Sequence, residues 1–299
     1  MTRPPVPPPA PGSGRPGSDV AIRLVVAPVV LGAVLCVVAL HDRTGDARFT
    51  DGLLALFGVG AAIEFVRLLR GPGRALATAP AALLSGLLAG VGLLAPDGPS
   101  ARFEARTLLV AAGLLLPLVA RLRDVRPEAL TAIALAWVPW LYVGFLLSFS
   151  RELGDGPEGA RRLIWFVVVA KASDMGGWVV GKAIGRHRMI PSVSPGKTWE
   201  GTAGGMLASV AAAVLLPAWL GLGAEAAWGL PLRVGFGVVV AAASILAGVT
   251  QSGWKRRVGV KDSSTLIPHM GGVLDMVDSL LLAGPAAWAW YRVLAIGGP

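Results

Sequence analysis

The stretch VGFGVVVAAASILAGVT, residues 234–250, decides the class of fold, because it contains no charged side chain. A helix that crosses a bilayer needs about 20 mostly apolar residues, and this run with its flanks is long enough. The composition extends the argument to the whole chain, since 54% of its 299 residues are hydrophobic and only 15% are charged. Together with a mean hydropathy of +0.66, these values are typical of a polytopic membrane protein.

Similar apolar runs recur along the sequence, and we predict an all-α fold with about nine spanning helices. The runs lie near residues 24–40, 50–66, 75–95, 106–120, 129–149, 163–184, 202–222, 234–250 and 273–296. Residues 1–20 are rich in proline and cannot bury apolar area, so we expect a disordered tail. We divide the remainder into an N-terminal set of helices, 21–150, and a C-terminal region, 151–299, which carries the polar motifs.

The formal net charge of +9 is interpreted as a signature of membrane topology. With the N-terminus in the cytoplasm, most Lys and Arg residues outside the spans fall on the cytoplasmic side, as the positive-inside rule requires. No basic surface interleaved with aromatic residues is found outside the spans, so nucleic acid is excluded as a partner. The same topology places the two most polar connections, 182–201 and 253–272, on the cytoplasmic side.

The connection 182–201 contains SVSPGKTWEG, which offers groups suited to a phosphate. Ser194 favours a tight turn, Lys197 supplies a point charge for phosphate, and Thr198 can cap the next helix. The N-terminus of that helix would favour an anion. Because Pro191 stands where a Walker A loop needs glycine, a P-loop is not predicted. The alternative is an ordinary capped loop whose lysine faces lipid headgroups.

The stretch KDSSTLIPHMGGVLDMVD, residues 261–278, gathers acids and bases at the start of the last apolar run. Lys261 and Asp262 are adjacent, so one can face a phosphate while the other holds a metal. Asp275 and Asp278 share one face of a helix, where they repel each other unless a cation lies between them. Oxygen ligands of this kind suit Mg²⁺, although the helix dipole alone also favours acids in a first turn.

Basic residues and glycines in and near these motifs each have a structural and a functional interpretation. Lys255 and Arg256 follow directly after a span and serve either as topology anchors or as phosphate ligands. Gly271 and Gly272 would let the backbone approach a phosphate, or give a flexible entry into the helix. Glu64 lies one turn from Arg67, and we interpret the two as a local pair near the membrane surface.

Charge inside a span is costly and is by default a functional signal. Lys171 and Asp174 lie one helical turn apart within the run 163–184. They either neutralise each other or belong to a site, and we favour a site role for Asp174 with Lys171 as its partner or a phosphate ligand.

With these polar motifs taken together, the C-terminal two-fifths of the chain resembles the CDP-diacylglycerol synthases, also called phosphatidate cytidylyltransferases. The residues in register with the signature of that family are Ser252, Lys255, Arg256, Lys261, Asp262, Ser264, Ile267, Pro268, Gly271, Gly272, Asp275 and Asp278. A second family feature is matched by Ser194, Pro195, Lys197, Thr198, Glu200 and Gly201, with Asp174 upstream. Two positions depart from the family: Met270 replaces a His, which is displaced to His269, and Met276 replaces an Arg.

The resemblance implies transfer of a cytidylyl group from CTP to phosphatidate at the cytoplasmic membrane face, giving CDP-diacylglycerol and pyrophosphate. It implies catalytic roles for Lys261, Asp262 and Asp278. It implies substrate contacts from Ser194, Lys197, Thr198, Glu200, Lys255, Arg256, His269, Gly271 and Gly272. Mg²⁺ would be held by Asp174, Asp262, Asp275 and Asp278, and a second cation is an open alternative.

The expected partners are therefore CTP, phosphatidate and membrane lipids, and a homodimer is compatible with a polytopic enzyme. The composition, with Arg favoured over Lys and many Ala and Gly residues, points to a bacterial plasma membrane. Three alternatives remain at this stage: a kinase of lipid alcohols, an ion or lipid transporter that uses the same acids, and an inactive scaffold of the same fold.

Overall fold

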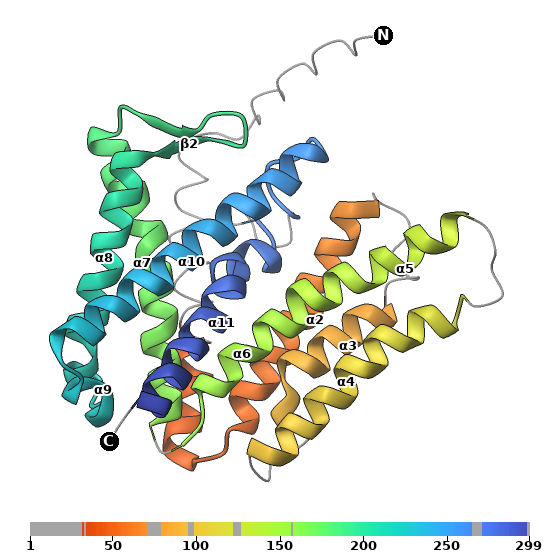
Figure 1. Cartoon of the computed structure of the whole chain (residues 1–299), viewed down its shortest axis with the longest axis horizontal. Coiled ribbons are helices and arrows are strands. Elements are labelled where there is room, and N and C mark those ends of the chain that lie inside the picture. The colour runs from red at the N-terminus through yellow and green to blue at the C-terminus, as the bar shows by residue number, and fades with distance from the viewer. Residues whose placement is uncertain are drawn as a thin grey trace.

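The chain forms a bundle of long helices with one small β-hairpin at one end (Figure 1). This computed structural model describes residues 32, 34–70, 79–94, 99–121, 127–156, 158–264 and 271–297. Within these ranges, five helices are long and apolar enough to cross a membrane. They occupy Arg48–Leu69, Ala129–Leu153, Gly159–Ile184, Trp199–Trp219 and Leu230–Arg257. The prediction of a mainly α-helical membrane protein is confirmed.

The helices are α2 (Arg48–Arg70), α3 (Ala79–Ala89), α4 (Pro99–Val119), α5 (Pro127–Pro139), α6 (Leu146–Leu153), α7 (Gly159–Ile184), α8 (Trp199–Trp219), α9 (Gly223–Ala227), α10 (Leu230–Arg257) and α11 (Val273–Gly297). Residues 34–44 are also helical. A short 3-10 helix, η2 (Val91–Leu93), follows α3, and a π-helical turn, η3 (Trp140–Phe145), joins α5 to α6. The π-turn begins directly after Pro139, which interrupts regular helical hydrogen bonding.

The count of nine spans and the cytoplasmic N-terminus remain predictions. The tail 1–20 and most of the run 24–40 lie outside the described residues. The run 75–95 is helical over α3, whose 11 residues span only about 16 Å, short of the roughly 30 Å of a bilayer core.

Small residues allow the helices of each half to pack closely. In the N-terminal half, Gly58 of α2 faces α3 so closely that a Cβ atom there would lie 3.0 Å from the Ser85 carbonyl oxygen. In the C-terminal half, a Cβ atom on Gly176 of α7 would lie 3.0 Å from the Gly204 carbonyl oxygen of α8. Close approach through glycine is typical of helices that pack inside a membrane.

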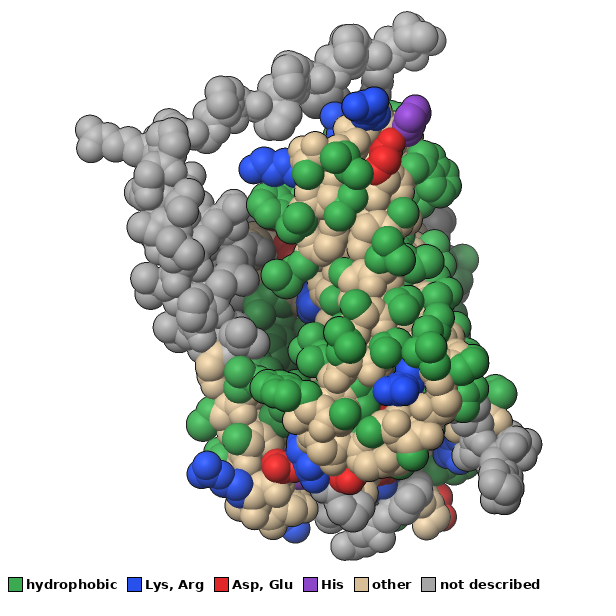
Figure 2. Space-filling model, turned by 90° about the vertical axis from the view of Figure 1, so that its left-hand side faces the viewer, with side chains coloured by type: hydrophobic (Ala, Val, Ile, Leu, Met, Phe, Trp, Pro, Cys, Tyr) green, Lys and Arg blue, Asp and Glu red, His purple; other side chains and the backbone are tan. Residues whose placement is uncertain are grey.

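The outer surface is consistent with a membrane environment. Figure 2 shows one face on which hydrophobic side chains cover most of the height, while charged side chains lie mostly near the two ends. Large apolar side chains of α7 and α8 point outward, including Trp178, Leu207 and Leu215, which are 66%, 71% and 68% exposed. Apolar side chains that are exposed over a broad surface mark contact with lipid or with another protein.

The connection 182–201 is not simply a loop, which corrects the sequence-based expectation. Its centre is an antiparallel hairpin of β1 (Arg188–Ile190) and β2 (Ser194–Thr198), in which Arg188 pairs with Thr198 and Ile190 with Ser194. β2 runs directly into α8, and the Thr198 hydroxyl caps that helix by accepting a hydrogen bond from the Gly201 amide (3.0 Å). The hairpin therefore places the SPGKT segment against the bundle.

Candidate active site

Polar side chains from four elements meet near the end of the bundle that carries the hairpin. α7 contributes Lys171 and Asp174, β2 contributes Lys197, α10 contributes Lys255, and the first two turns of α11 contribute Asp275 and Asp278. The structure thus brings together acids and bases that are up to about a hundred residues apart in the sequence.

Lys171 joins two of these acids. Its Nζ lies 3.5 Å from Asp278 Oδ1 and 3.9 Å from Asp174 Oδ2. Lys171 and Asp174 are therefore partners, and the site role expected for Asp174 remains a prediction. Both carboxylates remain partly accessible, with side-chain exposures of 41% for Asp174 and 21% for Asp278. A charged cluster that is still open to a ligand is suited to binding rather than to filling a core.

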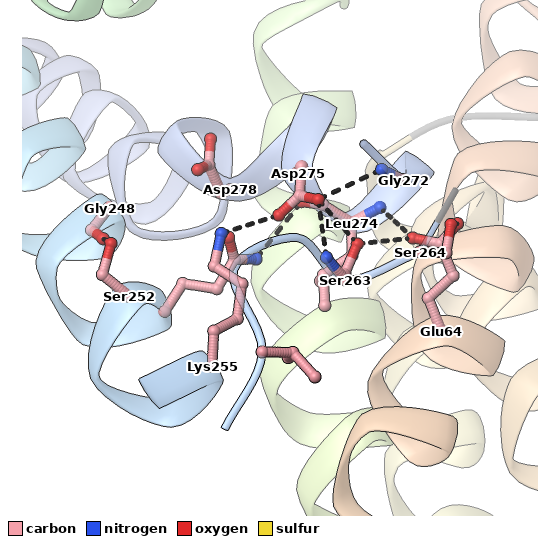
Figure 3. Close-up of polar contacts among 12 residues, drawn as sticks. Glu64, Gly248, Ser252, Lys255, Ser263, Ser264, Gly272, Leu274, Asp275 and Asp278 are labelled. Atoms are coloured by element: carbon pink, nitrogen blue, oxygen red, sulfur yellow. Dashed lines mark hydrogen bonds and ion pairs between the residues drawn. The ribbon is translucent and has the colours of Figure 1, made fainter. Parts of the chain in front are cut away.

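Asp275 is engaged by its own partners. Lys255 donates to Asp275 Oδ1 at 2.8 Å, while Oδ2 accepts from the Ser263 amide, the Ser263 hydroxyl and the Gly272 amide at 2.8, 2.9 and 3.1 Å (Figure 3). Asp278 points away from these bonds. The two acids thus have separate lysine partners, Lys255 for Asp275 and Lys171 for Asp278, and the cation expected between them remains a prediction.

The glycine pair accommodates protein carboxylates. Gly271 has φ of +88°, in the left-handed region, and a Cβ atom there would lie 2.5 Å from Asp275 Oδ2. A Cβ atom on Gly272 would overlap Glu64 Oε2 and the Ser263 hydroxyl. We predicted that these glycines let the backbone come close to a phosphate. In this structure they let the backbone come close to the carboxylates of Glu64 and Asp275.

A cavity of about 260 Å³ opens beside Asp174 and is lined also by Lys197, Thr198 and Gly201. Burial lowers the pKa of Lys197 and nearby Lys255 adds to this effect, whereas the carboxylates of Asp174 and Asp278 oppose it. The cavity therefore combines a lysine, an acid and the start of α8, where free backbone N–H groups favour an anion.

Comparison with known proteins identifies the family of this chain. The family model described as "Cytidylyltransferase family" matches residues 21–294. The chain belongs to this family. Among curated relatives, the protein named "Phosphatidate cytidylyltransferase" from Mycobacterium leprae (strain TN) is 31% identical over 169 residues, 56% of this chain and 51% of the relative. The protein of the same name from Brucella suis biovar 1 (strain 1330) is 34% identical over 155 residues, 52% of this chain and 56% of the relative.

A longer alignment exists with the "Phosphatidate cytidylyltransferase" of Mycobacterium tuberculosis (strain ATCC 25618 / H37Rv). It is 29% identical over 294 residues, which are 94% of this chain and 84% of the relative. With the M. leprae and B. suis proteins, by contrast, the chain aligns over only about half of their length. The family match extends over the N-terminal helices, beyond the part in which the sequence motifs were found.

Not all predicted site residues of this cytidylyltransferase family member join the cluster. Arg256 donates to the Val260 carbonyl oxygen (3.0 Å), and Lys261 and Asp262 are exposed on the loop before α11. Ser194 takes part in the hairpin pairing, and Glu200 accepts hydrogen bonds from the Arg186 and His187 amides. The site roles of these residues remain predictions. His269 and Met270 lie outside the described residues.

Glu64 is the residue that sequence reasoning missed. It does not serve as a local partner of Arg67, because its carboxylate is buried, with 3% exposure, and accepts hydrogen bonds from the loop before α11 and from the start of that helix. A signal was present, since an acid within an apolar run is costly unless it has partners. The local spacing of Glu64 and Arg67 concealed those partners.

Proposed function

We propose that this protein is a phosphatidate cytidylyltransferase, which converts CTP and phosphatidate to CDP-diacylglycerol and pyrophosphate. Family membership and the names of the relatives support this activity. The observation that carries the proposal is the position of the acid and lysine cluster between two unlike cavities. One lies beside Asp174 and Lys197 and carries both charges in its lining, and the other is almost entirely apolar. A lipid phosphate that reacts with a nucleotide needs both environments.

The apolar cavity has a volume of about 270 Å³ and includes Lys171 in its lining. Its other walls come from α2, α6, α7, α11 and the helix 34–44, and include Val168, Met276 and Leu280. Such a lining suits part of an acyl chain, because its apolar side chains resemble the hydrocarbon that surrounds the chain in a bilayer. Met276 stands where the family signature has an Arg, and it contributes apolar surface to this cavity. A methionine at this position is therefore compatible with lipid binding.

The reaction requires no protein nucleophile. A phosphate oxygen of phosphatidate attacks the α-phosphorus of CTP, a new P–O bond forms, and the bond between the α-phosphorus and the bridging oxygen breaks as pyrophosphate leaves. The protein must bring two polyanions together and stabilise the charge on the leaving group. We assign Lys171 to the lipid phosphate, because it lines the apolar cavity, and Lys197 to the nucleotide phosphates. Lys255, Lys261 and Arg256 are further candidates for phosphate contacts.

The donor set fits Mg²⁺, the cofactor that we propose. Asp174 and Asp278 come from different helices, converge on one ammonium group and have partly accessible side chains. Mg²⁺ prefers one or two carboxylates together with water and substrate phosphates. Asp262 is a further candidate ligand, whereas the hydrogen bonds of Asp275 favour a supporting role. When bound, Mg²⁺ would neutralise charge on the CTP phosphates and on pyrophosphate. No group of three potential ligands is found among the described residues.

The membrane location, the topology and the assembly of the protein are also proposals. We place the site at the cytoplasmic face of a bacterial inner membrane, where soluble CTP can meet a lipid whose chains stay in the bilayer. We retain the nine spans and the cytoplasmic N-terminus as proposals, and a homodimer as one assembly compatible with them.

The test is pyrophosphate release by the purified protein in detergent, with CTP, phosphatidate and Mg²⁺. We expect release that depends on CTP and lipid, is not supported by ATP, and is lost in Asp278→Asn. Asp46→Asn is the matched control, because the Asp46 side chain lies near the start of α2, is 44% exposed and pairs with Arg48. Cation flux into proteoliposomes without nucleotide would instead support a transporter. CTP binding without pyrophosphate release would support an inactive scaffold.

A further inference from the structure

We infer that Glu64 is a positioning residue, which holds the loop before α11 and the first turn of α11 in the geometry that the site requires. It belongs to α2, in the N-terminal half of the chain, outside the signature region. The inference rests on the proposed function only where enzyme activity is measured. The effect of Glu64 on the order of the α11 start can be measured without any activity.

The Glu64 carboxylate accepts hydrogen bonds from both sides of the segment that precedes α11 (Figure 3). On one side, the Ser264 hydroxyl donates to Oε1 at 2.7 Å. The Ser263 hydroxyl lies 3.0 Å from Oε2 and 2.9 Å from Asp275 Oδ2, so its single hydrogen can be donated to either carboxylate. On the other, the Val273 amide donates to Oε1 at 3.0 Å and the Leu274 amide to Oε2 at 2.8 Å. One side chain thus fixes the loop and the helix start relative to each other.

The chemistry of these donors requires a carboxylate. Val273 and Leu274 are the first residues of α11, and amides at a helix start have no partner within the helix. The positive end of the helix dipole also favours a negative charge at this position. Each Glu64 oxygen faces one of these amides. A glutamine has only one oxygen, so in either orientation its NH₂ group would face a backbone N–H that can only donate.

The Glu64 contacts lead directly to the proposed site. The Ser263 hydroxyl faces Glu64, while the Ser263 amide donates to Asp275, which in turn pairs with Lys255. Lys261 and Asp262 immediately precede Ser263, and Asp278 lies one helical turn beyond Leu274. Loss of the Glu64 contacts would therefore displace groups that are proposed to bind phosphate and metal, without removing any of them.

Glu64 can be changed without removing the packing that holds its helix. Its neighbour Phe65 lies in an aromatic cluster with Trp254 of α10 and Tyr142 of η3, with ring centroids 4.9 and 5.5 Å away. Phe65 is fully buried and Trp254 packs against the same core. These contacts do not involve the carboxylate, so α2 and α10 should stay together in a Glu64 variant.

The test compares Glu64→Gln and Glu64→Asp with a control, Glu225→Gln. Glu225 is also a buried carboxylate, with 1% exposure, but it pairs with Arg162 and Tyr291 far from the proposed site. Two quantities are measured on each full-length protein in detergent. One is the steady-state kcat and KM for CTP, and the other is hydrogen exchange of the backbone amides in the first turn of α11.

For Glu64→Gln we expect kcat to fall at least tenfold while KM for CTP changes less than threefold. Amide exchange at Val273 and Leu274 should become about tenfold faster, because a backbone N–H group loses its hydrogen-bond acceptor. Glu64→Asp keeps the charge and should recover part of kcat. Glu225→Gln should change neither kcat nor exchange in the first turn of α11, because its partner Tyr291 lies near the other end of that helix. Unchanged exchange at α11 in Glu64→Gln would overturn the inference, and so would a loss of kcat that Glu225→Gln matches. If the wild-type protein lacks cytidylyl transfer, the proposed function fails, while the exchange comparison still decides the role of Glu64.

Discussion

Replacement of Asp275 by Asn should separate a structural acid from a catalytic one. Asp275 and Lys255 form an ion pair of 2.8 Å in which both side chains are nearly buried, with exposures of 11% and 12%. An asparagine can keep its oxygen toward Ser263 and Gly272, but its NH₂ group then faces the Lys255 ammonium. The lysine would be left buried without a counter-charge.

The structure gives the expected size of this effect. Removal of one partner from a buried ion pair costs about 3–5 kcal/mol, and the retained loop hydrogen bonds favour the lower end, about 3 kcal/mol. At about 2–4 °C for each kcal/mol in a chain of this size, the melting temperature should fall by roughly 6–12 °C. Thermal unfolding of the purified protein in detergent, followed by tryptophan fluorescence, measures this shift.

Asp278→Asn is the matched comparison for Asp275→Asn. Asp278 lies 3.5 Å from Lys171, and both side chains are more exposed, at 21% and 33%. An exposed pair contributes about 0–1 kcal/mol, so Asp278→Asn should unfold within a few degrees of the wild type while losing turnover. If Asp275→Asn unfolds at the wild-type temperature, or Asp278→Asn is the less stable of the two, the division of roles between these acids is wrong.

Three further changes test the site. Gly272→Ala should inactivate and destabilise the protein by about 1–3 kcal/mol, because the new methyl group would overlap Glu64; Gly196→Ala, which meets no atom within 4 Å, should have little effect on unfolding. Lys197→Met should lower kcat about 100-fold through lost stabilisation of phosphate charge, and unchanged initial rates of pyrophosphate release would remove Lys197 from the site. Chelation of divalent cations with EDTA should abolish turnover, and added Mg²⁺ should restore it; activity that survives exhaustive chelation would contradict the metal proposal.

The parts of the fold that depend on local pattern could be predicted from the sequence. Long apolar runs gave α2, α7, α8 and α10, since the length of such a run reflects the thickness of the bilayer. The acids at positions 275 and 278 correctly indicated the start of a helix, as did Thr198 for α8. The hairpin was missed because strands of three and five residues have too little periodicity to be recognised.

The parts that depend on distant contacts could not be predicted. The i, i+3 spacing of Asp275 and Asp278 placed them on one face but could not show that Lys255 and Lys171 approach from different helices. Glu64 was assigned to Arg67 because that residue is near in sequence, whereas Ser263 and Ser264 are 199 and 200 positions away. Spacing predicts which side chains share a helix, and only packing decides which partners reach them.

The ion pair of Lys171 and Asp174 joins the two cavities, since Lys171 lines the apolar one and Asp174 the one that also contains Lys197. Under the proposed function, this arrangement has a kinetic consequence. The nucleotide arrives by diffusion in three dimensions and obeys a molar concentration, whereas the lipid arrives within the plane of the bilayer and obeys its mole fraction among the other lipids. Dilution of the whole sample should slow only the first encounter, and dilution with inert lipid should slow only the second.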